Sequence, residues 1–243
     1  MAKHSARILS VLLLTFALSG CGIIDYFYLP PPEDTAQELS ETGNDYMREH
    51  KYAKAAEAFT KLKDNFPFSP YAIAAELSLA DCYYLDEEWG PAVEAYKEFE
   101  AMHPRHEAIP YVLFNIGMAN LNGYPSIDRP TLQLDDAYAY FNRLRETYPG
   151  TEYADAATEK MAVCRKLMAE HELYVGDFYF RMGRYTSALA RYRDIMKDFS
   201  DVPDVYEHAS LKAKASFVKE REQQGEKKRE SREGTWKNWF NWL

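Results

Sequence analysis

The chain has 243 residues, with 29 Lys and Arg against 38 Asp and Glu, so its formal net charge at pH 7 is −9. This length suits one large domain or an extended array of repeats. The acidic balance argues against nucleic acid and against an anionic membrane surface as partners.

The first twenty residues have the organisation of a signal peptide. A basic start (Lys3, Arg7) precedes an apolar run from Ile8 to Leu18, which is too short to span a membrane. The run ends in Leu18-Ser19-Gly20-Cys21, the acceptor pattern of a bacterial lipoprotein. We expect cleavage before Cys21, a diacylglycerol on its thiol and an acyl chain on its amine, which together anchor stably. The alternative is a plain secretory signal that happens to hold a cysteine.

Residues 21–34 form the expected linker from this anchor to the folded part. They include Pro30-Pro31-Pro32, which favours a semi-stiff, extended tether. The thirteen residues after the cysteine span at most roughly 45 Å, so the first folded elements should stay near the membrane. Loss of Lys3 and Arg7 with the signal leaves a mature chain of formal charge −11. Membrane contact must therefore come from the lipid.

Four stretches of the chain share one internal spacing. Each has an alanine, then an aromatic residue four positions later, and three of the four have a proline a further eight positions on. The alanines are Ala55, Ala92, Ala137 and Ala188; the aromatics are Phe59, Tyr96, Phe141 and Tyr192; the prolines are Pro67, Pro104 and Pro149, with Ser200 in the fourth copy. A conserved inner spacing with variable gaps indicates a rigid unit with variable connections.

A small residue precedes each of these alanines by 12, 12, 20 and 12 positions. These small residues are Gly43, Ala80, Gly117 and Gly176. The pattern resembles the tetratricopeptide repeat, a helix–turn–helix unit of about 34 residues in which small residues let two helices approach closely. We therefore predict an all-α tetratricopeptide-repeat superhelix of about four to five helix pairs over residues 35–218, behind the lipoprotein signal peptide.

Irregularities in the repeats predict three further features. The third copy has eight extra residues, which we place in a loop over Asn122–Pro130 because they contain two prolines and a glycine. Fourteen extra residues before Gly176 contain neither Pro nor Gly, so they should lengthen one helix to about 154–182. A last helix should run from Pro203 to about Lys219, its part Val205–Phe217 forming half a repeat that caps the array.

The remaining residues, 219–243, form a charged, Trp-rich tail. Eleven of the fifteen residues from 219 to 233 are charged, which fits either a solvated single helix or disorder. Trp236, Trp239, Phe240 and Leu243 then fall on one helical stripe. Either this stripe docks on a partner or the membrane interface, or the tail folds back on its own array.

No constellation for catalysis or metal binding appears in the sequence, so we expect no enzyme and no cofactor besides the lipid. His103 and His106 bracket a proline without further ligands nearby, and we expect a solvated loop pair. Cys82 and Cys164 lie in helical apolar stretches, which favours two buried free thiols over a disulfide.

A binding scaffold is the remaining class, with a concave face lined by the first helix of each repeat. On the repeat spacing, we expect that face to hold Asn44, Met47, Asp81, Tyr84, Phe114, Met118 and Leu121. The alternative is that some of these residues belong to the core between repeats.

One stretch of sequence indicates which family of repeat proteins this chain resembles. Asn65-Phe66-Pro67-Phe68-Ser69-Pro70-Tyr71-Ala72 joins the first two repeats, and Asp128-Arg129 lies in the loop of the third. Together with the lipoprotein pattern, these resemble the BamD family, also called YfiO or ComL, over roughly residues 35–209. Two departures are the missing second helix of a fifth repeat and the Trp-rich tail.

The resemblance implies an outer-membrane lipoprotein that faces the periplasm and belongs to the β-barrel assembly machinery. Such proteins act as a scaffold and substrate-binding module for folding and inserting β-barrel proteins. The implied partners are the barrel-forming assembly subunit through its periplasmic domains, other assembly lipoproteins and unfolded β-barrel substrates.

The implied site residues fall into two groups. Substrate contacts are expected at Pro67, Phe68, Ser69, Pro70 and Tyr71, with Asn44, Asp81 and Tyr84 added from the concave face. Contacts to the barrel-forming subunit are expected at Arg184, Arg191 and Arg193. The alternative function is a scaffold for another envelope complex, as a secretin pilot or in cell-wall coordination.

Overall fold

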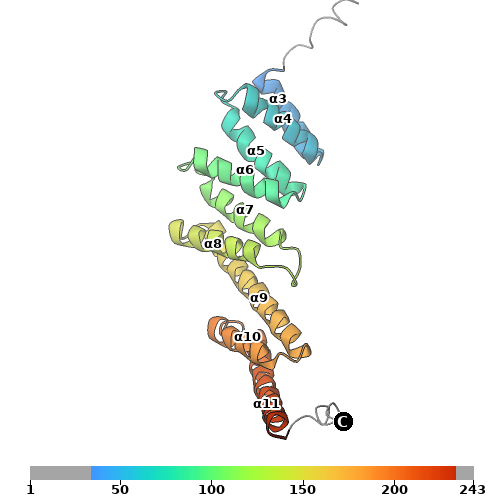
Figure 1. The fold of residues 1–243 in the computed structure, drawn as a ribbon. Helices are drawn as coiled ribbons and strands as arrows, with labels where there is room; N and C mark the ends of the chain where they lie inside the picture. The colour runs from blue at the N-terminus through green and yellow to red at the C-terminus, as the bar shows by residue number, and fades with distance from the viewer. Residues whose placement is uncertain (1–33, 234–243) are drawn as a thin grey trace, which may run out of the picture.

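A computed structural model describes residues 34–233 of the protein. The expected signal peptide, the lipidation site Cys21, most of the linker and the Trp stripe lie outside the described residues. Within them the protein is helical, with no strand, and the helices follow one another in a single elongated stack (Figure 1). The predicted all-α repeat fold is confirmed for this part of the chain.

The helices pair as the repeat spacing predicts. Repeat one is α3 (Ala36–Arg48) and α4 (Tyr52–Asn65), and repeat two is α5 (Ala72–Leu85) and α6 (Trp89–Met102). Repeat three is α7 (Ile109–Asn122) and α8 (Leu132–Thr147), and repeat four is α9 (Glu152–Arg181) and α10 (Tyr185–Asp198). The single helix α11 (Pro203–Glu233) follows. Each helix packs on the next one along the chain.

Close approach within a pair depends on glycine. A Cβ placed on Gly43 would lie 2.5 Å from the ring of Phe59, and one on Gly117 would lie 2.5 Å from the ring of Phe141. Both rings are almost completely buried. Each ring therefore fills the space that a side chain at the glycine would occupy.

The turns inside repeats one, two and four are alike. In each, the second of three linking residues has positive φ: 56° at His50, 59° at Glu87 and 70° at Gly183. Only glycine adopts this left-handed region without a steric cost. The same short turn is thus made three times, twice by residues that are strained in it.

The long helix predicted over 154–182 is confirmed as α9. Its N-terminal half contributes Ala157, Met161 and Cys164 to a hydrophobic cluster with α5 to α8, and Ala169 belongs to a separate cluster with α10 and α11. A third cluster joins α3, α4 and α5. The helix α9 therefore connects two blocks that each have their own core.

The predicted loop of repeat three lies between Asn122 and Leu132. It is held against α9, because His171 Nδ1 donates a hydrogen bond to the Ile127 carbonyl over 2.7 Å.

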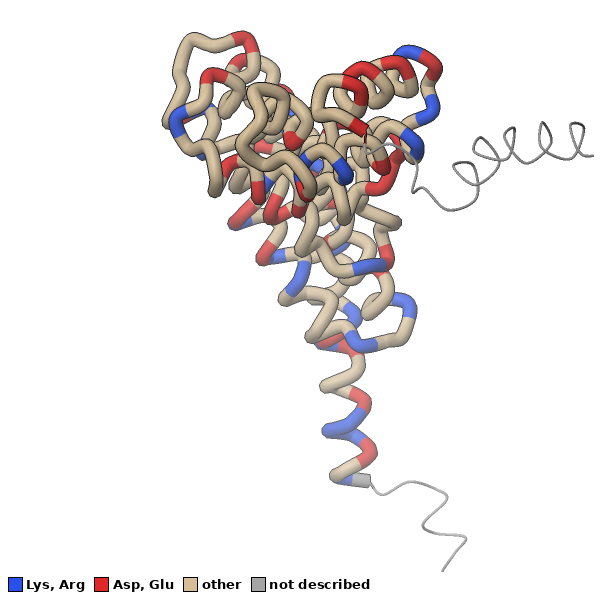
Figure 2. The backbone as a smooth tube through the Cα atoms, turned by 90° about the horizontal axis from the view of Figure 1, so that it is seen from above, with Lys and Arg blue, Asp and Glu red and all other residues tan. Residues whose placement is uncertain are grey.

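The last helix is longer than predicted. The expectation that it ends near Lys219 is wrong, since α11 continues to Glu233 and projects from the stack with charges of both signs along it (Figure 2). Residues 219–233 consist mainly of Glu, Lys, Arg and Gln, which favour helix, and Lys219 pairs with Glu222 over 3.0 Å. Of the two alternatives for this segment, the structure has the helix.

The two described cysteines are free and buried, as predicted. Burial raises the pKa of Cys82 to about 12 and that of Cys164 to about 11. Cys82 lies against Met47, with 3.2 Å between their sulfur atoms.

Candidate binding surfaces

The junction between repeats one and two is a tight turn with two aromatic side chains inside and one outside. Phe66 and Tyr71 pack on the cluster of α3, α4 and α5. The Ser69 amide donates to the Phe66 carbonyl over 3.0 Å, and the Ala72 amide donates to the Ser69 carbonyl over 3.1 Å. These contacts turn Phe68 outward, and its side chain is 100% exposed.

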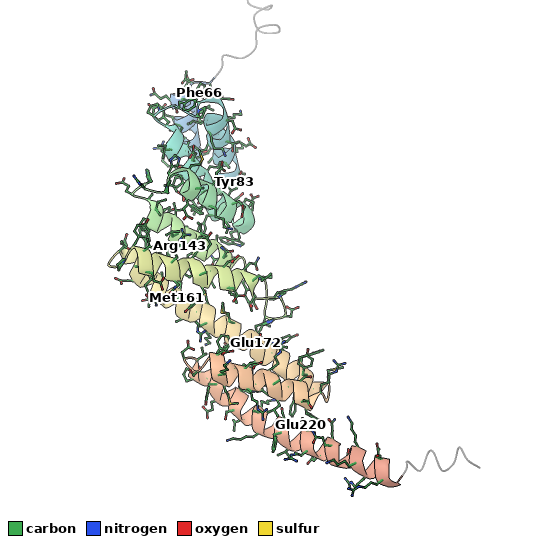
Figure 3. The ribbon with its side chains drawn as sticks, turned by 60° about the vertical axis from the view of Figure 1, so that its left-hand side comes forward. Phe66, Tyr83, Arg143, Met161, Glu172 and Glu220 are labelled. Carbon is green, nitrogen blue, oxygen red and sulfur yellow. The ribbon has the colours of Figure 1, made fainter. Side chains whose placement is uncertain are left out.

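Phe68 distinguishes this junction from the other two that carry the repeat proline. Each of those also has a half-buried ring before its proline, but Arg105 and Gly150 take the place of Phe68. The junction lies at the N-terminal end of the stack, where Phe66 is labelled (Figure 3). Pro67 and Pro70 flank the exposed ring and restrict the backbone on either side of it. The turn thus presents an aromatic ring that the fold itself does not use.

Asp81 does not lie free in a groove. Its Oδ1 accepts hydrogen bonds from the hydroxyl groups of Tyr96 (2.6 Å) and Tyr111 (2.7 Å), between repeats two and three. Burial raises the pKa of Asp81, although the two tyrosine hydrogen bonds oppose that shift. This geometry gives Asp81 a packing role, as in the alternative that assigned some of the expected face to the core.

Repeat four contains the same arrangement. Tyr192 donates to Asp177 over 2.6 Å, and Lys212 of α11 lies 3.7 Å from the same carboxylate. The sequence contains a signal for this Asp–Tyr hydrogen bond. In the two repeats whose aromatic residue is Tyr, the small residue of the first helix is followed by Asp. In the two repeats whose aromatic residue is Phe, it is followed by Asn44 or Met118. The pairing was missed because the two residues lie on different helices of the repeat.

The other expected face residues divide into exposed and packed ones. Asn44 is exposed, and Tyr84 is half-buried with its ring centroid 5.4 Å from that of Trp89 and its hydroxyl accepting from Asn122 over 3.3 Å. Phe114 packs on Phe141 and Tyr153, so its assignment to an open face is wrong. The remaining ones also pack on the hydrophobic clusters: Met47, Met118 and Leu121.

The expected solvated histidine pair is also wrong. His103 Nε2 lies 2.7 Å from Glu76 Oε2, and the His103 ring packs 4.9 Å from that of Phe99. His106 Nδ1 accepts a hydrogen bond from the Ala108 amide over 3.1 Å. Both rings thus hold the second junction together. Within residues 34–233, no group of three or more His, Cys, Asp or Glu side chains is placed to hold a metal ion.

The three arginines expected at the partner surface, Arg191 and Arg193 in α10 and Arg184 as its N-cap, are not on one face. Arg184 and Arg191 are seven residues apart and share a side of the helix, whereas Arg193 points to the opposite side. Arg191 Nη1 pairs with Glu172 Oε2 of α9 over 2.9 Å, and the other two side chains are exposed. Repeat four therefore offers a small basic site built from Arg184 beside a neutralised Arg191.

None of the described helices combines the length and the apolar composition needed to cross a membrane.

Comparisons with known proteins agree on one family. The family model described as YfiO, outer membrane lipoprotein, matches residues 32–232. The outer membrane protein assembly factor BamD of Neisseria meningitidis serogroup A is 28% identical over 218 residues, covering 84% of this chain and 82% of that protein. BamD of Vibrio cholerae is 24% identical over 180 residues, covering 70% of this chain and 75% of that protein.

Among solved structures, the crystal structure of MamA protein matches with a TM-score of 0.41 and 13% identity, over 82% of this chain and 95% of that one. This likeness is too distant to add to the description of the fold. The family match spans nearly all of the described residues, and the repeat array, the junction and the loop of repeat three all lie inside it. The chain belongs to the YfiO family of outer membrane lipoproteins.

Proposed function

We propose that this protein is an outer membrane protein assembly factor: a scaffold and substrate-binding module of the machinery that folds β-barrel proteins and inserts them into the outer membrane. Its membership of the YfiO family and its similarity to outer membrane protein assembly factors support this role. In this proposal the mature chain is anchored through lipid on Cys21 and faces the periplasm. It acts by binding and positioning other chains rather than by catalysis.

The observation that carries the proposal is the fully exposed ring of Phe68. A β-barrel precursor is an extended chain whose outward side chains are apolar and often aromatic. One ring on a tight turn can pack edge-to-face against such a side chain, for about 0.5–1.5 kcal/mol beyond the burial of its area. A contact of this size favours a hand-off, because the precursor must leave again for the membrane.

The neighbours of Phe68 shape this site without competing for it. Pro67 and Pro70 limit the backbone of the turn, and Ser69 and Tyr71 face the protein. The side chain of Asn44 on α3 and the half-exposed Tyr84 on α5 add polar contacts on repeats one and two. The packing role of Asp81 removes it from the proposed surface.

The proposed docking surface for the barrel-forming subunit is at the other end of the stack. Arg184 is exposed there and has no ion pair within the described residues, so an acidic group on the periplasmic domains of that subunit would pair with it, while Arg191 stays paired with Glu172. Exposed ion pairs contribute little each, about 0–1 kcal/mol, so this contact should weaken with salt. Other assembly lipoproteins are the further partners of the scaffold.

The test is site-specific photo-crosslinking in living cells, with a photoreactive amino acid at Phe68. We expect adducts with unfolded β-barrel precursors. Leu132 is the control position, because it is also a large apolar residue, 72% exposed, but lies on α8 in repeat three. Equal yields at the two positions, or adducts at Phe68 with a secretin or with cell-wall enzymes alone, would contradict the proposal.

A further inference from the structure

An apolar stripe lies uncovered on the C-terminal half of α9. Tyr174 and Phe178 stand at i and i+4 on one face of α9, and the C-cap residue Met182 follows at i+8. Their side chains are 38%, 47% and 59% exposed. His171 begins the same face one turn earlier, where it holds the loop of repeat three. We call Tyr174, Phe178 and Met182 the α9 stripe.

The repeat geometry explains why this face is uncovered. In the first helix of a repeat, two positions face the preceding repeat: the fifth before the small residue and the second after it. In α5 these positions hold Ala75 and Cys82, and in α7 they hold Val112 and Ala119, all of them buried. The corresponding positions in α9 are His171 and Phe178. The extra length of α9 lets α7 and α8 pack on its N-terminal half, and the C-terminal half slants away from them (Figure 1).

Repeat one has an uncovered face of the same kind. No repeat precedes it among the described residues, and its corresponding positions are the exposed acids Glu38 and Asp45. The uncovered face of repeat four carries aromatic side chains where that of repeat one carries acidic ones. An exposed apolar patch of this kind on a soluble repeat indicates that something covers it.

We propose that the covering element is the chain's own C-terminal segment, residues 234–243. This segment holds Trp236, Trp239, Phe240, Trp242 and Leu243, and so three of the four tryptophans of the protein. The family match ends at residue 232, so this segment lies outside it. A segment of this composition fits the apolar face that α9 leaves open.

The segment is long enough to reach the stripe. Gln223 Nε2 donates to the Gly183 carbonyl over 3.1 Å, which places that point of α11 next to the end of α9. Glu233 lies ten residues farther along α11, or about 15 Å, and Phe178 lies about 7 Å back along α9 from Gly183. Ten extended residues span about 33 Å, which covers this return path and a helix diameter.

The part of α11 next to the segment offers it no apolar surface, because the side chains from Lys219 to Arg232 are polar or charged, apart from Gly225. The exposed apolar side chains of α11, Leu211, Phe217 and Val218, lie on its earlier turns. A tethered segment also has an effective concentration in the millimolar range, above that of any second copy of the chain in dilute solution. Both points favour the α9 stripe as the docking site of the segment.

Disulfide trapping in cells tests this with the full-length lipoprotein. The pair Phe178→Cys and Trp242→Cys should close an intramolecular disulfide, detected by mass spectrometry of the digested protein. The control pair replaces Phe178→Cys by Ser187→Cys, an exposed position on the first turn of α10 within the same reach but off the stripe. We expect the stripe pair to close at least about tenfold faster, because docking raises the local concentration above that of a free tether.

A second pair, Met182→Cys with Trp239→Cys, should behave like the first. Equal rates for stripe and control pairs would overturn the proposal, as would failure of both stripe pairs to close. A disulfide between two copies would assign the stripe to a dimer instead. The native thiols Cys82 and Cys164 are buried and do not compete.

Discussion

Single residues fix the distance between the two helices of a repeat. Gly117→Ala would place a methyl group 2.5 Å from the Phe141 ring, which is completely buried and has no room to move. We expect a loss of about 1–3 kcal/mol in the free energy of unfolding. The control is Gly90→Ala, where no atom lies within 4 Å, and the change should stay within about 1 kcal/mol. Denaturant unfolding of both variants checks this, and equal stabilities would contradict the packing account.

The buried carboxylate of Asp81 gives stability a pH dependence. Burial raises its pKa above the usual value of 3.8, so the folded state holds this proton more tightly than the unfolded state does. The stability from that proton is present at low pH and is lost as the pH rises from 3.8 through the raised pKa. Relative to Asp81→Asn, which cannot titrate, the wild type should therefore lose stability across that window. Urea midpoints of the two proteins that run parallel from pH 3.5 to 7 would refute it.

The sequence predicts only some of these side-chain contacts. The repeat spacing locates Gly117 and Phe141 as partners, since both recur in other copies. It does not show that Asp81 bonds two tyrosines or that His103 pairs with Glu76, because those contacts join helices whose relative rotation is set by the packing of whole repeats. For the same reason the spacing alone placed Phe114 on an open face instead of against Phe141 and Tyr153.

At the scale of elements, α9 connects the two blocks of the stack, and Arg165 lies at the crossing. Its Nε and Nη2 bind the Asp201 carboxylate over 2.9 and 2.5 Å, Nη2 also binds the Asp198 carbonyl over 2.5 Å, and the guanidinium lies 4.8 Å over the Phe199 ring. These contacts fix the end of α10 and the start of α11 on the middle of α9. The residues labelled Met161 and Glu172 in Figure 3 bracket this position.

Arg165→Ala should therefore loosen the C-terminal block. We expect a loss of about 1–2 kcal/mol, a modest figure because Asp201 is half exposed and solvent screens the pair. Lys166→Ala is the matched control, because that side chain is 56% exposed and its ion pair with Glu170 is long, at 3.9 Å. This substitution should change the free energy of unfolding by less than about 0.5 kcal/mol. Hydrogen exchange should rise in α10 and α11 of the Arg165 variant and stay unchanged in α3 to α6; a uniform rise along the chain would be inconsistent with separate blocks.

The elements themselves are largely readable from the sequence. The recurrent alanine locates the second helix of each repeat, a proline follows its end in the first three repeats, and the absence of Pro and Gly predicts the length of α9. The end of α11 was misjudged because the apolar pattern stops near residue 219, whereas alternating charges and high helix propensity extend the helix without a core. The uncovered stripe on α9 was also not foreseen, because it depends on where α7 and α8 come to rest along a lengthened helix.

At the scale of the whole molecule, the protein is an elongated stack with three clusters of buried side chains rather than one core. The exposed Phe68 lies near one end, and the arginines of α10 lie toward the other. In the proposed role, a scaffold of this shape holds a client and a partner subunit at separate places. The proposed lipidation of Cys21 and the burial of the two other thiols can be tested in one experiment.

Thiol labelling provides that test. The native protein at pH 8 should react only very slowly with a thiol reagent, because both thiols are buried and their pKa values are about 12 for Cys82 and about 11 for Cys164. These values leave at most about one thiolate in a thousand. After denaturation, mass spectrometry should count two labels, since the Cys21 thiol is expected to carry lipid. Three labels would show a free Cys21, and one or none would show that Cys82 and Cys164 are oxidised.

The proposed role in barrel assembly is tested most directly by depleting the protein in its own cells and quantifying outer-membrane proteins by mass spectrometry. An assembly factor predicts that β-barrel proteins as a class fall severalfold while other outer-membrane lipoproteins keep their levels, and that wild-type protein restores them. A normal set of barrel proteins after depletion, or loss of a secretin alone, would contradict the account.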